Sequence, residues 1–406
     1  MKPKSDLLRG VALLACLVAL PLAPTGAAVQ QATTDTAPDS GEIDELERAA
    51  GPVPREIPIA LLVDLSNDQI LFSREADRRF VPASVTKVMT AYTAFRLVDE
   101  GTLSLDMQVE ITPELLGDWR RKGSTLFLEP GDHISVEELL LGITTVSAND
   151  ASIVLARIVA GSVPKWTDMM NENARELGMA DSHFGTPNGW MDDGNTFTTA
   201  HDLALLGEAM TERYPNLYGR FFGKRGMRFN GYAQDNHEML TGRVEGGDGI
   251  KTGYTRRAGN TFLGSAERDG RRLVLVIAAA DDYEVRNRAA VDLVQWGYGA
   301  FEHRVFAEAG ETIGFAEVQD GRRPQLALVA PEDIAFAVPG GAREIRASII
   351  YDGPLPAPIS AGDRVATLRI EGHGMPVYER PLVARDDVMK AGVIRRIGQG
   401  IASWFS

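Results

Sequence analysis

Three short groups of residues have the types and spacing needed for acyl transfer through a serine ester. A serine and a lysine three positions apart could act as nucleophile and base. A serine and an asparagine two apart could move a proton and hold an amide, and a Lys-Thr-Gly tripeptide could bind an anion. In chain order these residues are Ser84 and Lys87, then Ser147 and Asn149, then Lys251, Thr252 and Gly253. Each short pattern also occurs by chance, so only the joint occurrence is evidence of function.

The first group predicts an activated serine. A serine hydroxyl is a weak nucleophile until a base takes its proton. Residues three apart at the start of a helix share one face, so Lys87 is within reach of Ser84. Lysine is a base only when neutral, and burial or a second cation such as Lys251 favours that form. The alternative is that Ser84 only caps a helix. Ser162 and Lys165 have the same spacing, and we interpret them as the start of an ordinary surface helix.

The second group is predicted to lie in a loop between two helices. The Ser147 hydroxyl could relay a proton between lysine amines and a leaving amine. The Asn149 amide offers both a donor and an acceptor to a substrate peptide bond. A helix cap, a position that favours serine and asparagine, is the alternative.

The third group opens a region of predicted strands. Lys251 and Thr252 could hold a substrate carboxylate, and glycine at 253 lets a substrate strand approach the backbone closely. The backbone N–H groups of Ser84 and Tyr254 would form an oxyanion hole, worth about 3–4 kcal/mol per donor. A simple hairpin turn is the alternative.

The periodicity of the chain predicts a sheet packed against a helical cluster, followed by a small all-β domain. Apolar runs bounded by turn residues predict strands, and apolar residues at helical spacing predict helices. The strands expected in the first part cover residues 57–65, 69–72, 261–267 and 272–279. The helices expected there begin at Ser84 and cover residues 136–143, 151–159, 166–177, 201–210 and 285–298. In the second part, strands are expected at 325–329, 344–351, 364–370 and 377–382.

Composition limits the function classes. The 406 residues suffice for two domains, and 44% hydrophobic and 24% charged residues are typical of a globular protein. A net charge of −14 argues against a nucleic-acid partner, because phosphate binding needs a basic surface. The 6 histidines show no ligand spacing and Cys16 is the only cysteine, so we expect no metal and no cofactor.

The N-terminus predicts export. Lys2, Lys4 and Arg9 precede an apolar run and then small residues, so residues 1–28 are typical of a signal peptide. The sequence around Cys16 loosely resembles a lipoprotein acylation site, but the apolar run continues past it, which argues against lipidation. Residues 29–54 are predicted to be a flexible acidic leader.

The C-terminal tail predicts contact with a membrane surface. Apolar residues recur at helical spacing in 386–406, and the opposite face is basic. Such an amphipathic helix can lie in a membrane interface but cannot span the bilayer, because Arg395 and Arg396 lie mid-segment. A helix docked on its own protein is the alternative.

These residues together resemble the low-molecular-mass D-alanyl-D-alanine carboxypeptidases (peptidase family S11), which are penicillin-binding proteins. The resemblance extends from about residue 57 to 406. The segments that carry it are 82–92, 170–179, 183–184, 188–189, 199–203, 248–255 and 258–259, and more loosely the β-rich segment and the tail. Thr186-Pro187-Asn188-Gly189 and Tyr254 depart from forms common in the family, at the rim of the expected cleft.

The resemblance implies a fold, a reaction and a location. We expect an α/β (α+β) domain of the serine β-lactamase and DD-peptidase type over 55–300, a β-rich domain over 301–385 and an anchor helix over 386–406. The implied reaction removes the terminal D-alanine from peptidoglycan pentapeptide stems, with β-lactams as inhibitors. The implied location is the periplasmic face of the bacterial cytoplasmic membrane. Ser84 is then the nucleophile and Lys87 its base, with Ser147 assisting; Asn149, Lys251, Thr252, Gly253, Tyr254 and Arg286 contact the substrate.

Three other functions use the same residues. A DD-endopeptidase would cleave cross-links, and a β-lactamase would add a glutamate that activates the deacylating water. Glu172 and Glu176 follow a carboxypeptidase-like pattern instead. A non-catalytic envelope protein that binds wall peptides is the third.

Overall fold

The computed structural model describes residues 51–340, 345–372 and 375–392. The predicted signal peptide, most of the predicted leader and residues 393–406 of the predicted anchor helix lie outside the described residues. The chain divides into two compact units, one covering Gly51–Gly299 and the other beginning at Ala300.

The Gly51–Gly299 unit is built on an antiparallel five-stranded sheet with the strand order β2-β1-β9-β8-β7. The N-terminal hairpin therefore pairs with strands from the far end of the unit. The strands are β1 (Ile59–Asp64), β2 (Gln69–Arg74), β7 (Gly247–Thr255), β8 (Gly259–Arg268) and β9 (Arg271–Ala280). β7 lies at the edge of the sheet, which leaves one side of its backbone open to other partners.

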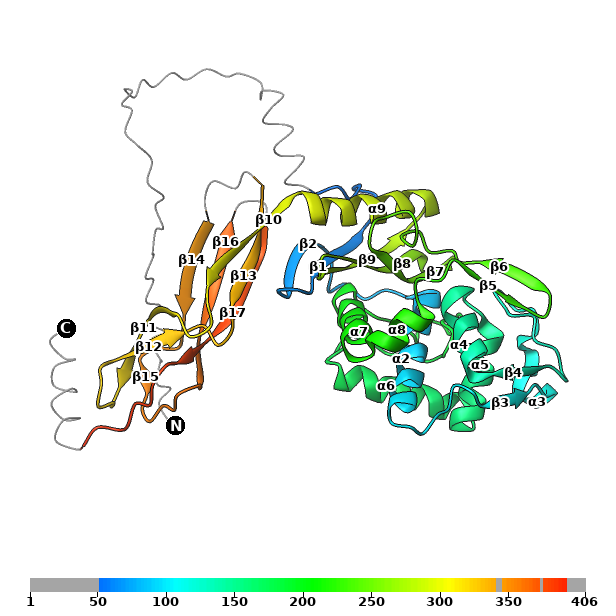
Figure 1. Ribbon diagram of the computed structural model, residues 1–406, viewed down its shortest axis with the longest axis horizontal. Helices are drawn as coiled ribbons and strands as arrows, with labels where there is room; N and C mark the ends of the chain where they lie inside the picture. The colour runs from blue at the N-terminus through cyan, green and yellow to red at the C-terminus, as the bar shows by residue number, and fades with distance from the viewer. Residues whose placement is uncertain (1–50, 341–344, 373–374, 393–406) are drawn as a thin grey trace, which may run out of the picture. The chain divides into compact units, whose positions relative to one another are not determined.

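Helices cover both faces of this sheet, with α9 on one face and the other helices on the opposite face (Figure 1). The helices are α2 (Thr86–Asp99), α3 (Pro113–Leu116), α4 (Val136–Thr145), α5 (Asn149–Ala160), α6 (Val163–Glu176), α7 (Ala200–Arg213), α8 (Pro215–Phe221) and α9 (Tyr283–Gly299). Two 3-10 turns, η1 (Ala83–Val85) and η2 (Gly117–Trp119), and two small two-stranded sheets complete the unit. One pairs β3 (Gln108–Glu110) with β4 (His133–Ser135), and the other is the hairpin of β5 (Gly226–Phe229) and β6 (Tyr232–Asp235).

Local signals fix where several helices begin. The Ser135 side chain accepts the Glu138 backbone N–H and the Glu138 side chain accepts the Ser135 N–H, which is a complete capping box for α4. The Thr199 side chain caps α7. Ser162 caps α6 by accepting the Lys165 backbone N–H, which confirms that the second serine–lysine pair is the start of a helix. One continuous apolar core then joins these helices to the sheet.

The second unit is all-β. Its six-stranded sheet has the order β14-β16-β17-β12-β11-β15, and β10 pairs separately with β13. The strands are β10 (Phe301–Ala307), β11 (Thr312–Gln319), β12 (Gln325–Val329), β13 (Ile334–Pro339), β14 (Ile345–Ile350), β15 (Leu355–Pro356), β16 (Arg364–Gly372) and β17 (Met375–Ala384). The unit has its own apolar core, which confirms the predicted combination of a mixed and an all-β fold.

Two predicted boundaries differ from the structure. Residues 51–54, assigned to the leader, are tied to β2, because the Arg74 guanidinium donates to the carbonyl oxygens of Val53 and Pro54. Residues 386–391, assigned to the anchor helix, are not helical: Val388 and Lys390 form β-bridges with Ile359 and Gly321. Both segments satisfy backbone groups through contacts distant in sequence, which local patterns do not encode.

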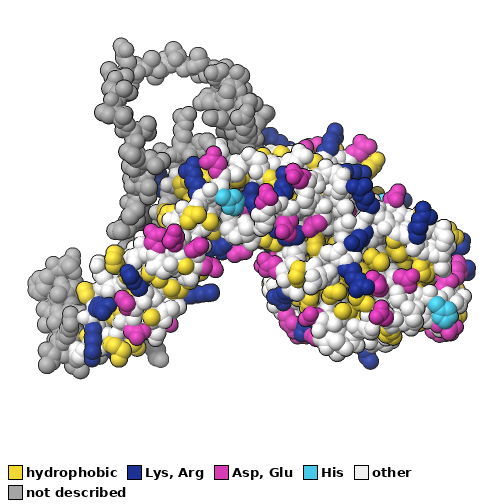
Figure 2. Space-filling view, viewed as in Figure 1, with side chains coloured by type: hydrophobic (Ala, Val, Ile, Leu, Met, Phe, Trp, Pro, Cys, Tyr) yellow, Lys and Arg dark blue, Asp and Glu magenta, His cyan; other side chains and the backbone are white. Residues whose placement is uncertain are grey.

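The visible face of the first unit is mixed in charge, with acidic and basic side chains interspersed (Figure 2). Within the described part of the chain, no helix is both long enough and apolar enough to cross a membrane.

Candidate active site

The first predicted pair lies at the start of α2. Ser84 is half-buried in the turn η1, and Lys87 is 1% exposed in the first turn of the helix that follows. Ala83 has a φ of 49°, so the backbone turns sharply just before the serine. The N-terminal end of a helix carries a positive partial charge, which favours a neutral lysine and a developing oxyanion nearby.

The Lys87 amine has three oxygen neighbours. Its Nζ atom lies 3.0 Å from Ser84 Oγ, 2.8 Å from Asn149 Oδ1 and 2.7 Å from the Asn188 carbonyl oxygen. Both the amide oxygen and the carbonyl oxygen can only accept hydrogen bonds. A neutral amine with two N–H groups therefore satisfies both of them and directs its lone pair at the Ser84 hydroxyl.

The surroundings of Lys87 favour this neutral form. Burial lowers the pKa of the Lys87 amine well below its usual value, and the nearby positive charge of Lys251 lowers it further. The Asp150 carboxylate opposes this shift. Asp150 is fully buried and accepts backbone N–H groups of Leu126 and Leu128, so its charge is already partly satisfied.

The second group lies where α4 passes into α5. Ser147 is buried with a φ of 64°, a left-handed conformation that is uncommon for residues other than glycine. Asn149 is the first residue of α5 rather than part of a loop. Its Nδ2 donates to the Lys122 carbonyl oxygen at 2.9 Å, which turns Oδ1 toward Lys87. In the described structure the Ser147 hydroxyl makes no hydrogen bond to Lys87 or Lys251.

The third group lies on the edge strand β7. A Cβ atom built on Gly253 would lie 2.6 Å from the Pro82 carbonyl oxygen and 3.0 Å from the Ser84 backbone nitrogen. Only glycine allows this approach of β7 to the nucleophile turn. Tyr254 follows with 61% exposure, so its side chain lies outside the buried part of the site.

Two buried cations lie near the nucleophile and have no carboxylate partner among the described contacts. The Lys251 amine donates to the Thr252 carbonyl oxygen at 2.9 Å, and burial and the charge of Arg286 lower the pKa of Lys251 to about 7. Arg286 lies in the first turn of α9 and donates to the Thr261 carbonyl oxygen at 3.1 Å; burial lowers its pKa to about 10. A bound anion would offset the charges of both groups, which fits their predicted role in holding a substrate carboxylate.

Comparison with known proteins shows the family to which the chain belongs. Residues 54–282 match the family model described as D-alanyl-D-alanine carboxypeptidase (peptidase S11). The chain belongs to the D-alanyl-D-alanine carboxypeptidase family. Residues 301–390 match the model of the penicillin-binding protein 5 C-terminal domain.

Relatives in this family match most of the chain. The D-alanyl-D-alanine carboxypeptidase DacC of Escherichia coli strain K12 is 32% identical over 85% of this chain and 90% of its own. The crystal structure of penicillin-binding protein 5 from Haemophilus influenzae covers 84% of this chain and 100% of its own, with a TM-score of 0.70 and 29% identity. Penicillin-binding protein D2 from Listeria monocytogenes in its ampicillin-bound form covers 60% of this chain and 98% of its own, with a TM-score of 0.54 and 28% identity.

Three residues make contacts or charge interactions near Lys87 and Lys251 that the sequence did not predict. The Asn188 carbonyl oxygen accepts from Lys87. Gly189 has a φ of 72°, and a Cβ there would lie 1.8 Å from the Ala83 carbonyl oxygen. His237, one of the histidines that show no ligand spacing, has its pKa lowered first by burial and then by the charges of Lys251 and Arg286. The Pro-Asn-Gly sequence at 187–189 is a turn signal that could have indicated the first two.

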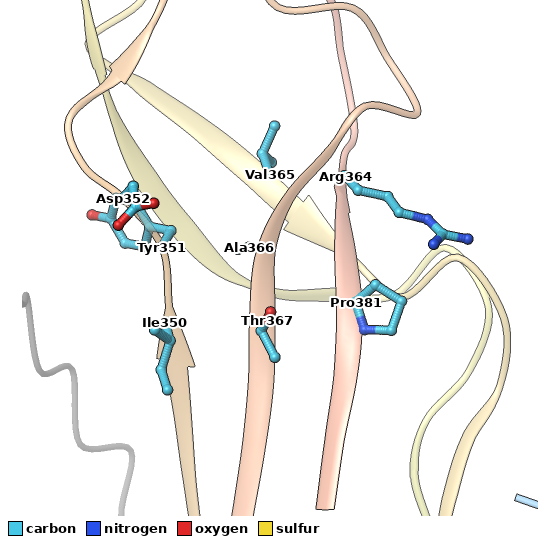
Figure 3. Close-up of a pocket in the computed structure, with 8 residues that line it drawn as sticks. All are labelled: Ile350, Tyr351, Asp352, Arg364, Val365, Ala366, Thr367 and Pro381. Carbon is cyan, nitrogen blue, oxygen red and sulfur yellow. The ribbon is translucent and has the colours of Figure 1, made fainter. Parts of the chain in front are cut away.

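A separate hollow of about 400 Å³ lies on the β-rich unit (Figure 3). Its charged lining residues are Asp352 and Arg364, and Figure 3 shows the Arg364 guanidinium pointing away from Asp352. The hollow contains no paired nucleophile and base, so the candidate active site is the cluster around Ser84. Among the described residues, no cluster of three or more His, Cys, Asp or Glu side chains could hold a metal ion.

Proposed function

We propose that this protein is a serine-type D-alanyl-D-alanine carboxypeptidase that removes the terminal D-alanine from peptidoglycan pentapeptide stems. The observation that carries the proposal is the position of the buried Lys87 amine, 3.0 Å from Ser84 Oγ with two acceptor-only oxygens on its other sides. The family of the chain and the substrate named for its relatives support the choice of a D-alanyl-D-alanine end.

Acylation begins when Lys87 takes the Ser84 proton and Oγ bonds to the carbonyl carbon of the penultimate D-alanine. The electron pair of the carbonyl moves to its oxygen, which the backbone N–H groups of Ser84 and Tyr254 stabilise. The intermediate collapses, the C–N bond breaks, and the terminal D-alanine leaves with a proton delivered through Ser147. The acyl-enzyme is then an ester of Ser84.

Deacylation uses water in place of D-alanine. The water oxygen bonds to the ester carbon as Lys87 takes a water proton, and the ester bond to Ser84 breaks. The proton returns to Ser84 Oγ, and the shortened peptide releases the second water proton to solvent and leaves as a carboxylate. Lys87 thus ends the cycle in the neutral state in which it began.

Substrate binding uses β7 and the buried cations. An extended peptide can pair with the open edge of β7, because an edge strand presents unpaired backbone groups. The peptide's C-terminal carboxylate then lies against Lys251, Thr252 and Arg286, while Asn149 binds a peptide amide of the substrate. Gly253 leaves room for the bound peptide, and Tyr254 lies at the rim of the cleft.

The test is a product assay on a synthetic peptide that ends in D-Ala-D-Ala. The wild-type protein should release free D-alanine, and Ser84→Ala should release none. A wild type that leaves this peptide intact but cleaves cross-linked peptide dimers would contradict the proposal and favour an endopeptidase. A wild type that hydrolyses benzylpenicillin rapidly and spares both peptides would favour a β-lactamase.

We also propose a location and a division of the chain. Residues 1–28 direct export, 29–54 include a leader, 55–300 form the catalytic domain and 301–385 the β-rich domain. The tail within 386–406 attaches the protein to the periplasmic face of the cytoplasmic membrane through the apolar face that its sequence predicts. Flotation with anionic lipid vesicles tests the attachment: the full chain should float, and a chain ending at residue 392 should not.

A further inference from the structure

A lysine between two tryptophans lies beside the active site, and nothing in the proposed mechanism uses it. The Lys122 Nζ atom lies 4.5 Å from the Trp119 ring centroid and 5.5 Å from the Trp190 ring centroid. The two rings meet edge to face with centroids 5.6 Å apart. Asp118 pairs with the same amine at 3.2 Å. These four residues, named here the Lys122 cluster, join two loops that are distant in sequence.

The first of these loops sets the orientation of Asn149. The Lys122 carbonyl oxygen accepts the Asn149 Nδ2–H at 2.9 Å, and the Ser124 carbonyl oxygen accepts the Asn149 backbone N–H at 2.8 Å. Gly123 packs between them: a Cβ there would lie 2.7 Å from Asn149 Nδ2 and 2.9 Å from the Trp190 ring. The loop therefore determines which end of the amide faces Lys87.

The second loop supplies the other acceptor of Lys87. The Trp190 backbone N–H donates to Asn188 Oδ1 at 3.0 Å, and the Asn188 carbonyl oxygen accepts from Lys87 at 2.7 Å. Gly189 holds this loop against the carbonyl of Ala83, next to the nucleophile. Trp190 therefore belongs to the same short loop as the carbonyl group that contacts Lys87.

We propose that the Lys122 cluster holds these two loops together over Lys87, so that Lys122 and Trp190 act as positioning residues for the base. This inference rests on the proposed function. The cluster touches neither Ser84 nor Lys87 directly. It acts through the Lys122 carbonyl, Asn149 and Asn188, which fix both N–H directions of Lys87 and keep water from its amine.

The protonation state of Lys87 depends on the groups around its amine and on whether the two loops keep water away from it. Ser84, Asn149 and Asn188 contact its Nζ atom. Lys251 on β7 contributes a positive charge and Asp150 on α5 a negative one. Opening the loops would admit water, which stabilises the protonated amine and screens Lys251. The fraction of neutral Lys87 at a given pH would fall, and with it the acylation rate.

The experiment measures the second-order rate constant of acylation by a chromogenic cephalosporin from about pH 5 to pH 10 in the full-length protein. In Lys122→Met and Trp190→Ala we expect the acid limb of the pH–rate profile to shift to higher pH by about one unit. The rate should fall about tenfold on the acid side and change little on the plateau. Lys122→Arg and Trp190→Phe, which keep the cation or the aromatic face, should remain close to wild type.

Lys165→Met is the matched control, because Lys165 is an exposed lysine on α6; its profile should coincide with wild type. Coincidence of the Lys122→Met and wild-type limbs would overturn the inference. An unchanged limb with a raised KM for peptide would overturn it too, since that result indicates direct substrate contact. A wild type that is never acylated would instead remove the proposed function and this inference with it. If Trp190→Ala fails to fold, the Lys122→Met and Lys122→Arg pair decides.

Discussion

The Nζ atom of Lys87 lies 3.0 Å from the Oγ atom of Ser84, and both side chains belong to one turn of chain at the start of α2. Lys87 is 1% exposed, so this contact is formed away from bulk water. A buried amine that contacts a hydroxyl is a base only if burial keeps it neutral. Activation of Ser84 therefore requires a neutral Lys87.

Replacing Lys87 with methionine tests the role of the amine. Lys87→Met keeps the length and apolar stem of the side chain but removes the base, so acylation by benzylpenicillin should slow by about 10²–10⁴-fold. Folding should be preserved, because the substitution removes a buried amine rather than a packed apolar group. Stopped-flow acylation and thermal unfolding measure the two effects. An acylation rate within twofold of wild type would refute the assignment of Lys87 as base.

The depressed pKa of Lys251 predicts a specific dependence of stability on pH. Its pKa is about 7 in the folded protein and 10.5 in the reference state. Between these values the unfolded chain binds a proton that the folded protein does not bind. Falling pH therefore favours the unfolded state, by about 1.4 kcal/mol per unit, until the folded amine is protonated near its own pKa.

Lys251→Met should abolish this dependence and make the inactive variant more stable than wild type at neutral pH. The difference in the free energy of unfolding between variant and wild type should be larger at pH 7 than at pH 9 by roughly 2 kcal/mol. Urea unfolding at both pH values measures it. Lys165→Met, which replaces an exposed lysine, should show no such change. A difference that grows with pH would contradict the assigned sign.

Gly189 tests the close packing behind the nucleophile. A Cβ at this position would lie 1.8 Å from the Ala83 carbonyl oxygen, and the residue has a φ of 72°. Gly189→Ala should therefore destabilise the fold by about 3 kcal/mol or more and slow acylation. Gly270→Ala is the matched control: its φ of 79° is similar, but nothing lies within 4 Å of the added atom. Gly270→Ala should lower the free energy of unfolding by only about 1 kcal/mol, from backbone strain. Equal losses in the two variants would contradict the steric argument.

Arg286 tests how the substrate carboxylate is recognised. Arg286 is 6% exposed and lies near Lys251, and its guanidinium donates to two neutral acceptors, the Thr261 carbonyl oxygen and Asn287 Oδ1. Arg286→Gln should lower kcat/KM for a peptide with a free C-terminal carboxylate by about 10- to 100-fold. The same peptide with a C-terminal amide should react poorly with both proteins. Unchanged discrimination between the two peptides in the variant would exclude Arg286 from carboxylate binding.

Local patterns predicted the parts of the site that lie on one element. Ser84 and Lys87 could be paired from spacing alone, because helical geometry fixes where residues three apart lie. The Asn188 carbonyl could not be paired with Lys87 in the same way, since 101 residues separate them and only tertiary packing brings them together. The Lys122 carbonyl, which orients Asn149, is a backbone group, so its role does not depend on the residue type and cannot be predicted from it.

The fold shows the same division. The ends of β12 were predicted at Gln325 and Val329 as observed, because strand alternation and flanking turn residues are local signals. Residues 51–54 are held in place by hydrogen bonds from Arg74. Residues 386–391 are extended, with β-bridges to Ile359 and Gly321. These contacts are distant in sequence, so composition assigned residues 51–54 to a flexible leader and periodicity assigned residues 386–391 to a helix.

The most direct test of the acyl-enzyme is the intact mass of the full-length protein during incubation with benzylpenicillin, followed by peptide mapping. We predict one covalent adduct, on Ser84, in the wild type and no adduct in Ser84→Ala. An adduct that persists in Ser84→Ala, or a wild type that stays unmodified while the penicillin stays intact, would contradict the assignment of Ser84 as nucleophile.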